Sequence, residues 1–238
     1  MGLFCYDESM SSRRLYSIDY FEGQDSIERY APFSLLAPLT KRNKWVQRQV
    51  LQAIKAKERR FAHKRALAIL NNFRPKKTLD VGTATGELIE ELLKEKVDAW
   101  GVEASDYMIS AQKNPQLSKR ILRAYADKLP FENESFDVVT GYHLLEHIQE
   151  QELEKNLGEM ARVSKKIIFF EFPTTKNPWG KVDNTHVSLF NDGWWLKKFQ
   201  KSLPEWEVDY YRSSNTLRAM QVTIKKKGPT PFKPRNYS

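Results

Sequence analysis

The chain has 238 residues, a formal net charge of +9 and a hydrophobic content of 40%, which is ordinary for a globular protein. It contains no apolar run near the roughly 18 residues that a membrane-spanning helix needs, and its only cysteine, Cys5, excludes an internal disulfide framework. The first residues lack the basic and then apolar pattern of a signal peptide, so we expect a cytoplasmic protein.

Basic residues are concentrated in two segments, 55–65 and 225–235, and the isoelectric point is near 9.4. Such charge attracts anionic partners, such as RNA, a membrane surface or an acidic glycan. A lysine-rich solvated surface accounts for the same charge without any partner. Both interpretations stay open, as does the oligomeric state.

Residues 1–75 are predicted to form an arm followed by a helical cap. The arm is rich in aromatic residues without a clear period, among them Tyr16, Tyr20, Phe21 and Tyr30, so we expect it to pack over the active site. Between residues 41 and 73, apolar residues recur at helical spacing. This spacing predicts two helices, or one long bent helix, ending before Pro75.

From residue 76 to 227, predicted strands and helices alternate, which is typical of a doubly wound α/β domain with a parallel sheet. The expected strands are 77–81, 99–102, 121–125, 136–140 and 166–172, and the expected helices are 87–94, 106–113, one around His143, and 152–162. Residues 205–212 and 219–225 are predicted to form a terminal antiparallel pair. Residues 228–238 are expected to be an extended basic tail.

The loop 82–86, Gly-Thr-Ala-Thr-Gly, follows the first predicted strand and precedes a helix, as in nucleotide-binding folds. A dinucleotide fingerprint starting at Gly82 would need glycine where the chain has Ala84 and Glu87, and an acid at 87 would face a pyrophosphate. A P-loop is excluded because no Lys-Ser/Thr pair follows Gly86. The loop therefore favours a ligand without phosphates.

Three carboxylates at the ends of predicted strands indicate what this ligand is. Glu103 ends the second strand and can accept hydrogen bonds from both hydroxyls of a ribose. Asp127 follows the third strand and can accept from an adenine amino group, while Asp80 ends the first and can bind an ammonium or order the loop. A ligand with adenine, ribose and ammonium groups but no phosphate is S-adenosylmethionine.

Five motifs, in this order and spacing, resemble those of class I S-adenosylmethionine-dependent methyltransferases. They are residues 79–86 (LDVGTATG), 101–105 (GVEAS), 126–131 (ADKLPF), 136–139 (FDVV) and 144–147 (LLEH). The resemblance covers about residues 76–173 and implies a Rossmann-like, mostly parallel seven-stranded sheet with an antiparallel last strand. Ala84 departs from the family, which more often has glycine there. The arm, the cap and residues 185–188 are more loosely similar to bacterial methyltransferases of glycan and secondary-metabolite pathways.

The resemblance also implies a set of cofactor-binding residues around the loop and the strand ends. They are Asp80, Gly82, Thr83, Ala84, Thr85, Gly86, Glu103, Ala104, Met108, Asp127, Lys128, Leu129 and Tyr142.

Histidines near the expected site of methyl transfer suggest how an acceptor hydroxyl loses its proton. His143, Glu146 and His147 are spaced so that a helix would place them on one face, and His186 lies in the segment after the fifth strand. His186 or His143 can act as a general base. Alternatively, all four residues can hold a divalent metal, an arrangement that resembles metal-assisted 2′-O-methyltransferases of small-RNA 3′ ends and ubiquinone-pathway O-methyltransferases. Those enzymes have Glu at the position of His143, so we predict no resident metal; a purely structural role for Glu146 and His147 is the third possibility.

Aromatic residues gather again between residues 172 and 195, at Trp179, Phe190, Trp194 and Trp195. They can line an acceptor pocket that stacks against a sugar or a phenol, or they can form the core of an inserted helix over residues 192–199.

Taken together, the sequence predicts a methyltransferase that uses S-adenosylmethionine to O-methylate a small-molecule or sugar-containing acceptor. The alternative is an RNA methyltransferase of the metal-assisted 2′-O type, motivated by the net charge and the basic cap. A third hypothesis is a pseudoenzyme that binds the cofactor without catalysis.

Overall fold

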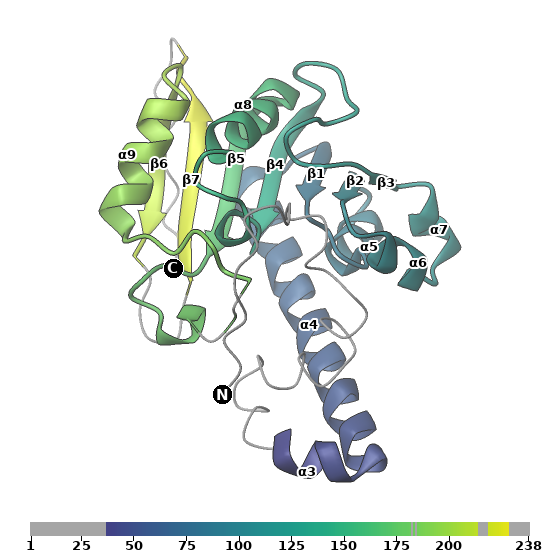
Figure 1. The fold of residues 1–238 in the computed structure, drawn as a ribbon. Coiled ribbons are helices and arrows are strands. Elements are labelled where there is room, and N and C mark those ends of the chain that lie inside the picture. The colour runs from purple at the N-terminus through teal and green to yellow at the C-terminus, as the bar shows by residue number, and fades with distance from the viewer. Residues whose placement is uncertain (1–36, 182, 184, 214–218, 229–238) are drawn as a thin grey trace.

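The computed structural model describes residues 37–228 with the exception of 182, 184 and 214–218 (Figure 1). The predicted aromatic arm, with Tyr16, Tyr20, Phe21 and Tyr30, lies outside the described residues, and so does the predicted tail beyond Gly228. The predicted boundary between cap and methyltransferase domain falls in the loop between a long helix and the first strand.

A seven-stranded sheet with strand order β3-β2-β1-β4-β5-β7-β6 forms the centre of the molecule (Figure 1). The strands are β1 (Lys77–Val81), β2 (Asp98–Glu103), β3 (Ile121–Arg123), β4 (Phe136–Tyr142), β5 (Ser164–Phe172), β6 (Trp206–Arg212) and β7 (Met220–Lys226). Strands β1 to β5 pair in parallel, and β7 runs antiparallel to both β5 and β6. The predicted fold class, a doubly wound mostly parallel sheet with an antiparallel last strand, is therefore confirmed.

Helices surround the sheet largely where the sequence predicts them. They are α3 (Ala37–Arg42), α4 (Lys44–Phe73), α5 (Glu87–Lys94), α6 (Asp106–Ala111), α7 (Pro115–Ser118), α8 (Leu153–Val163) and α9 (Asp192–Ser202), with 3-10 turns at Leu145–His147 and Pro178–Lys181. The cap is a short helix followed by one 30-residue helix, which Asn43 caps by accepting hydrogen bonds from two backbone N–H groups. The helix predicted over 106–113 is present but ends two residues earlier, at Ala111. A further short helix, α7, follows it, because Asn114 caps a new helix that has Pro115 in its first turn.

The predicted helix around His143 is wrong. His143 has a φ of 51°, in the left-handed region, and its backbone N–H donates to the carbonyl of Glu171 at 2.7 Å. This bond extends the β4–β5 pairing by one residue, so that only the single 3-10 turn Leu145–His147 follows. Helical spacing therefore does not align His143 with Glu146 and His147.

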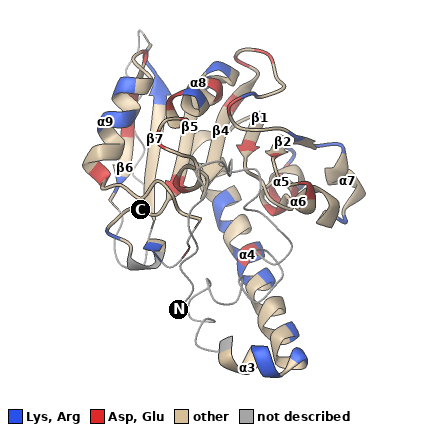
Figure 2. Cartoon of the chain, in the orientation of Figure 1, with Lys and Arg blue, Asp and Glu red and all other residues tan. Residues whose placement is uncertain are grey.

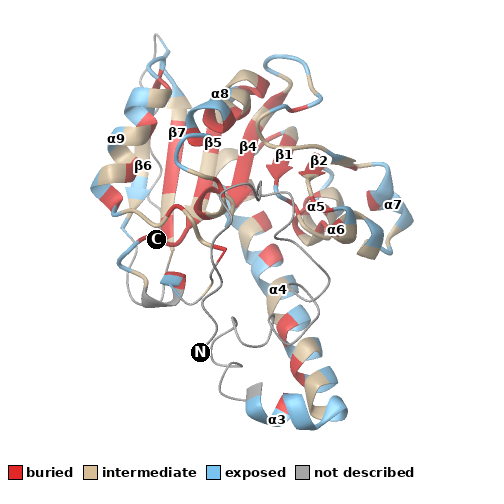
Figure 3. Cartoon of the chain, in the orientation of Figure 1, coloured by how far each residue is buried: buried red, intermediate tan, exposed pale blue. Residues whose placement is uncertain are grey.

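The core lies on both faces of the sheet (Figure 3). On one face, α4 and α5 pack together through Ala66, Ile69 and residues of α5 such as Ile89 and Leu92. On the other face, α8 and α9 bury side chains such as Leu157 against the strands. Strands buried on both faces are typical of parallel sheets.

The aromatic residues after β5 belong mainly to this core. Trp195 and Phe172 are fully buried with ring centroids 4.7 Å apart, and Phe199 of α9 stacks on Phe170. Phe190 and Trp194 are partly buried and stacked at 3.7 Å, and the side chain of Trp179 lies outside the described part of the chain. The hydrophobic core around α9 therefore accounts for Phe190, Trp194 and Trp195.

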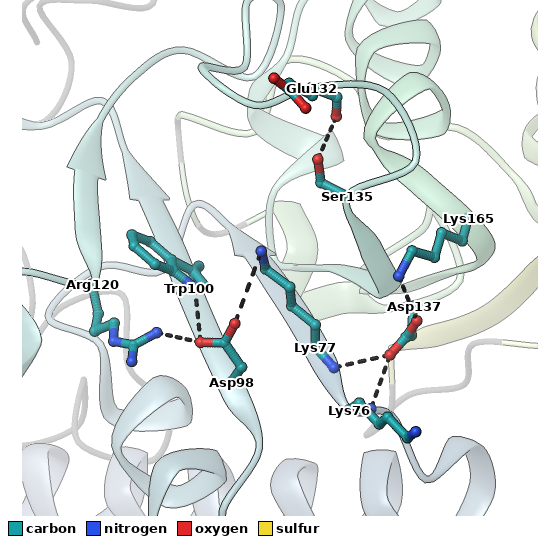
Figure 4. Close-up of polar contacts among 9 residues, drawn as sticks. All are labelled: Lys76, Lys77, Asp98, Trp100, Arg120, Glu132, Ser135, Asp137 and Lys165. Atoms are coloured by element: carbon teal, nitrogen blue, oxygen red, sulfur yellow. Dashed lines mark hydrogen bonds and ion pairs between the residues drawn. The ribbon is translucent and has the colours of Figure 1, made fainter.

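A polar network holds the amino ends of the parallel strands in register (Figure 4). The carboxylate of Asp137, at the start of β4, accepts hydrogen bonds from the backbone N–H groups of Lys76 and Lys77 at 2.9 and 3.0 Å. Lys165, at the start of β5, binds the other oxygen of Asp137 at 3.2 Å. Similarly, Asp98 at the start of β2 binds Arg120 and accepts from the Trp100 indole. With the amino ends aligned, the carboxyl ends of these strands meet at the opposite edge.

Helix α4 projects beyond this carboxyl edge. Its residue Arg65 contacts Glu171 at the end of β5, whereas its last residue, Phe73, lies just before the amino end of β1. The first 20 or so residues of α4 therefore extend past the edge, over ~30 Å at 1.5 Å per residue, with α3 at the far end (Figure 1). None of the helices among the described residues is both long and apolar enough to cross a bilayer.

Candidate functional site

The loop after β1 has the backbone geometry of a ligand cradle. Gly82 and Gly86 have φ values of 76° and 86°, which glycine adopts without strain. The N–H groups of Gly82 and Thr83 both donate to the carbonyl of Val102 on β2, at 2.9 and 3.1 Å. Ala84 also has a positive φ, 51°, which costs an L residue about 1 kcal/mol; this strain explains why glycine would fit better there.

Glu103, at the end of β2, is hydrogen-bonded to the backbone of this loop. Its carboxylate accepts hydrogen bonds from the backbone N–H groups of Ala84 and Ser105, both at 2.8 Å. Burial raises the pKa of Glu103, and these backbone hydrogen bonds partly oppose the shift. Each carboxylate oxygen has two lone pairs, so both keep the capacity to accept a ribose hydroxyl.

Asp80, at the end of β1, is only 4% exposed. It accepts a hydrogen bond from the hydroxyl of Thr140 on β4 at 2.7 Å. Burial raises its pKa to about 6, although the hydrogen bond works in the opposite direction. A cation placed beside Asp80 would stabilise its charged form.

The third predicted carboxylate, Asp127, lies in the loop after β3. Its oxygen Oδ2 lies 2.8 Å from Nζ of Lys155 on α8, in a largely exposed ion pair that contributes little stability. If Asp127 accepted a hydrogen bond from an adenine amino group, that bond would compete only with the weak ion pair to Lys155.

Other predicted cofactor residues surround this region. Met108 is buried on α6, Leu129 is buried with its N–H donating to Glu159 at 2.8 Å, Ala104 is partly buried, and Lys128 is exposed. Tyr142 is buried at the end of β4.

Arg65, which was not among the residues predicted from the sequence, enters the site from α4. Its guanidinium lies 3.0 Å from Glu171 Oε1 and 4.4 Å from the centroid of the Tyr142 ring. Burial disfavours the charge, but the charge of Glu171 outweighs this and raises the pKa of Arg65. In the sequence, Arg65 is one of many basic residues on a cap helix, and no local signal separates it from the exposed ones.

His143 and Glu146 form a hydrogen-bonded pair just beyond the end of β4. His143 Nδ1 lies 3.0 Å from Glu146 Oε1, and Glu146 is fully buried whereas the His143 side chain is 48% exposed. Desolvation lowers the pKa of His143, but the hydrogen bond to Glu146 and its negative charge outweigh this and raise it. Despite its burial, Glu146 has a lowered pKa because of the same hydrogen bond, so the carboxylate is ionised.

A second group of side chains meets on the other side of Glu146. Candidate ligand atoms of Glu146, His147 and His186 lie within 4.8 Å of one another. His186 Nδ1 is 2.6 Å from the carbonyl of Gly180, so it carries the proton and leaves the lone pair on Nε2. Metal bonds of ~2.1 Å would draw these atoms closer together. Three of the four predicted metal ligands are thus clustered. The fourth, His143, is outside this cluster and is hydrogen-bonded to Oε1 of Glu146.

The structure therefore brings most of the predicted site residues to one edge of the sheet. The loop, Asp80 and Glu103 lie at the ends of β1 and β2, and Tyr142, His143 and Glu146 at the end of β4. Carboxylates rather than lysines lie next to the loop, which suits a cationic ligand without phosphates. This donor set fits S-adenosylmethionine.

Comparison with known proteins also indicates a methyltransferase fold. Residues 79–168 match the family model described as a methyltransferase domain. No curated protein matches the chain. A S-adenosylmethionine-dependent methyltransferase from Archaeoglobus fulgidus is similar in structure with a TM-score of 0.58 and 17% identity, over 71% of this chain and 94% of that one.

Magnesium protoporphyrin IX methyltransferase from Synechocystis, crystallised with bound S-adenosylmethionine, matches with a TM-score of 0.62 and 10% identity, over 93% of this chain and all (100%) of that one. A methyltransferase from Haloferax volcanii, in complex with the Trm112 methyltransferase activator, matches with a TM-score of 0.56 and 17% identity, over 72% and 92%. Identities this low show a common fold alone.

Proposed function

We propose that this chain is a class I S-adenosylmethionine-dependent methyltransferase and that it methylates a hydroxyl group of a small-molecule or sugar-containing acceptor, with His143 as the general base. The hydrogen-bonded pair of His143 and Glu146 at the end of β4 carries this proposal. The bound cofactor supplies an electrophilic methyl group, so the chain's own residues have to position the acceptor and remove its proton.

In this mechanism, Glu146 fixes the tautomer of His143. The ionised carboxylate only accepts hydrogen bonds, so Nδ1 of His143 carries the proton and Nε2 has the lone pair. Nε2 takes the proton of the acceptor hydroxyl, and Glu146 stabilises the imidazolium that forms. His186 is held by Gly180 and is only 11% exposed, so the geometry favours His143 over His186 as the base.

A screen of candidate acceptors with isotopically labelled cofactor tests the proposed reaction directly. The expected result is a mass gain of one methyl group on the oxygen of a small-molecule or sugar-containing compound. Exclusive transfer to nitrogen or carbon would contradict O-methylation.

The pH dependence of turnover tests the pairing of the two side chains. A base acts in its neutral form, so kcat should rise with pH through the raised pKa of His143. In Glu146→Gln the negative charge that raises this pKa is lost, so the rising limb should move to lower pH while the plateau falls. Glu150→Gln, an exposed change nearby, should leave the limb in place. An unmoved limb in Glu146→Gln would contradict the pairing.

The cluster of Glu146, His147 and His186 makes metal dependence a necessary control. If His143 acts as the base without a metal, exhaustive chelation should change kcat by less than about twofold, against the 10²–10⁴-fold effect of a lost base. Loss of turnover on chelation, restored by a divalent cation, would instead assign the cluster as the acceptor-activating metal site.

A second candidate function, methylation of RNA, is favoured by the charge of the projecting cap (Figure 2). Between residues 41 and 64, Glu58 is the single acidic residue among the basic residues Lys41, Arg42, Lys44, Arg48, Lys55, Lys57, Arg59, Arg60 and Lys64. Binding of a labelled single-stranded RNA should then weaken with salt, with a log–log slope of about −0.7 per phosphate contacted. No binding at low salt would remove this candidate.

A further inference from the structure

Arg65 occupies a position from which it can reach a ligand at the carboxyl edge. It belongs to α4, yet its guanidinium lies between Glu171 at the end of β5 and the ring of Tyr142 at the end of β4. It is also close enough to Asp80, at the end of β1, for the two charges to interact. Its side chain is only 19% exposed, so the packing around it fixes its position.

The hydrogen-bonding capacity of Arg65 is only partly used. Its Nε atom is buried and has no partner in the part of the chain that the structure describes. Glu171 contacts a terminal nitrogen of Arg65 through Oε1, while its Oε2 accepts from Gln221 at 2.7 Å. A buried N–H that lacks a partner is unfavourable by about 1–3 kcal/mol, so an additional acceptor at this position would be stabilising.

We propose that Arg65 binds the α-carboxylate of S-adenosylmethionine. A guanidinium has five N–H donors in a planar fork that matches the two oxygens of a carboxylate. Asp80 lies on the neighbouring strand end, where it can bind the α-ammonium group of the same amino-acid moiety. The site thus presents one cation and one anion to a zwitterion, and this assignment holds whichever acceptor the enzyme uses.

Apolar packing of the cap helix on this domain determines where Arg65 lies. Ala66 and Ile69 pack against α5 and hold the second half of α4 on the sheet. This packing places Arg65 at the level of the strand ends. The cap therefore contributes a residue to the cofactor site, in addition to covering the sheet.

Two ligands that differ only at the amino-acid end test the proposal. S-adenosylhomocysteine has the carboxylate, whereas 5′-methylthioadenosine keeps the adenosine and the sulfur but lacks the amino-acid part. In the full-length Arg65→Met variant, calorimetry should show about 10–100-fold weaker binding of S-adenosylhomocysteine, as expected for lost hydrogen bonds between charged groups. Binding of 5′-methylthioadenosine should stay within about threefold of wild type.

Three further variants make the result decisive. Arg60→Met removes an exposed arginine of the same helix and should change neither affinity. The double variant Arg65→Met/Glu171→Gln avoids leaving a buried carboxylate unpaired, and it should show the same selective loss. Arg65→Lys should give an intermediate loss, because lysine keeps the charge but not the planar fork. Equal weakening of both ligands, or unchanged binding of S-adenosylhomocysteine, in the double variant would overturn the proposal.

Discussion

Replacing His143 by alanine is expected to lower kcat by about 10²–10⁴-fold, the usual contribution of a general base. The imidazole is held by buried Glu146 on one side and is about half exposed on the other, so it can reach an acceptor but is not part of the core. Its backbone bond to Glu171 does not depend on the side chain. Affinity for S-adenosylmethionine, measured by calorimetry, should therefore stay close to wild type.

Two histidine variants serve as controls for this result. His63→Ala removes an exposed imidazole that pairs with Glu91 on the surface and should leave turnover unchanged. His186→Ala separates the two candidate bases, because its ring is tied to Gly180 and lies beside His147. If His186→Ala abolishes turnover while His143→Ala retains it, the base is His186 and the present assignment fails.

The second large effect is expected at Glu103. Glu103→Ala should weaken binding of S-adenosylhomocysteine by about 100-fold or more, because the two charge-assisted hydrogen bonds that we expect Glu103 to make to the ribose would be lost. The change also leaves the N–H groups of Ala84 and Ser105 without their carboxylate, so the loop loses its support. Calorimetry measures the affinity, and the ligand-induced rise in Tm provides a second readout.

Asp106→Ala is a matched control for Glu103→Ala. Asp106 is an exposed acid three residues further along, paired with Arg123, so its loss should not change ligand affinity. Glu103→Gln keeps one acceptor oxygen and the shape of the side chain and should lie between wild type and alanine. Wild-type affinity in Glu103→Ala would remove Glu103 from the ribose site.

The two predictions test independent parts of the site. In the proposed function, Glu103 would support cofactor binding through the loop after β1, whereas His143 would act on the acceptor at the end of β4. A variant at one position should therefore leave the readout of the other unaffected. The two residues are separated because Glu103 ends β2 and His143 follows β4, and β1 lies between these two strands in the sheet.

Parts of the site could be predicted from the sequence because they depend on short-range patterns. The loop at 82–86 sits between a strand and a helix whose boundaries, Lys77–Val81 and Glu87–Lys94, the sequence predicts correctly. Residues at the carboxyl ends of parallel strands must meet at one edge, so Asp80, Glu103 and the residues after β4 could be grouped without knowing any distance.

Other features depended on packing between distant segments. Arg65 reaches the site only because α4 docks on α5 and ends before β1, and no local pattern distinguishes it from Arg60. The predicted helix around His143 failed because pairing with Glu171 on β5 continues one residue past β4. The aromatics after β5 proved to be core because α9 packs on the same face of the sheet as α8.

The sequence by itself thus determined the fold class and the phosphate-free cofactor, because both depend on the order of strands and the residues at their ends. The tertiary structure decided which charged and titratable side chains are in contact. These pairs are His143 with Glu146, His147 with His186, and Arg65 with Glu171. Such pairs join residues from turns and helices whose relative positions are set by burial of apolar surface. That burial is collective and non-directional, so local sequence patterns do not contain it.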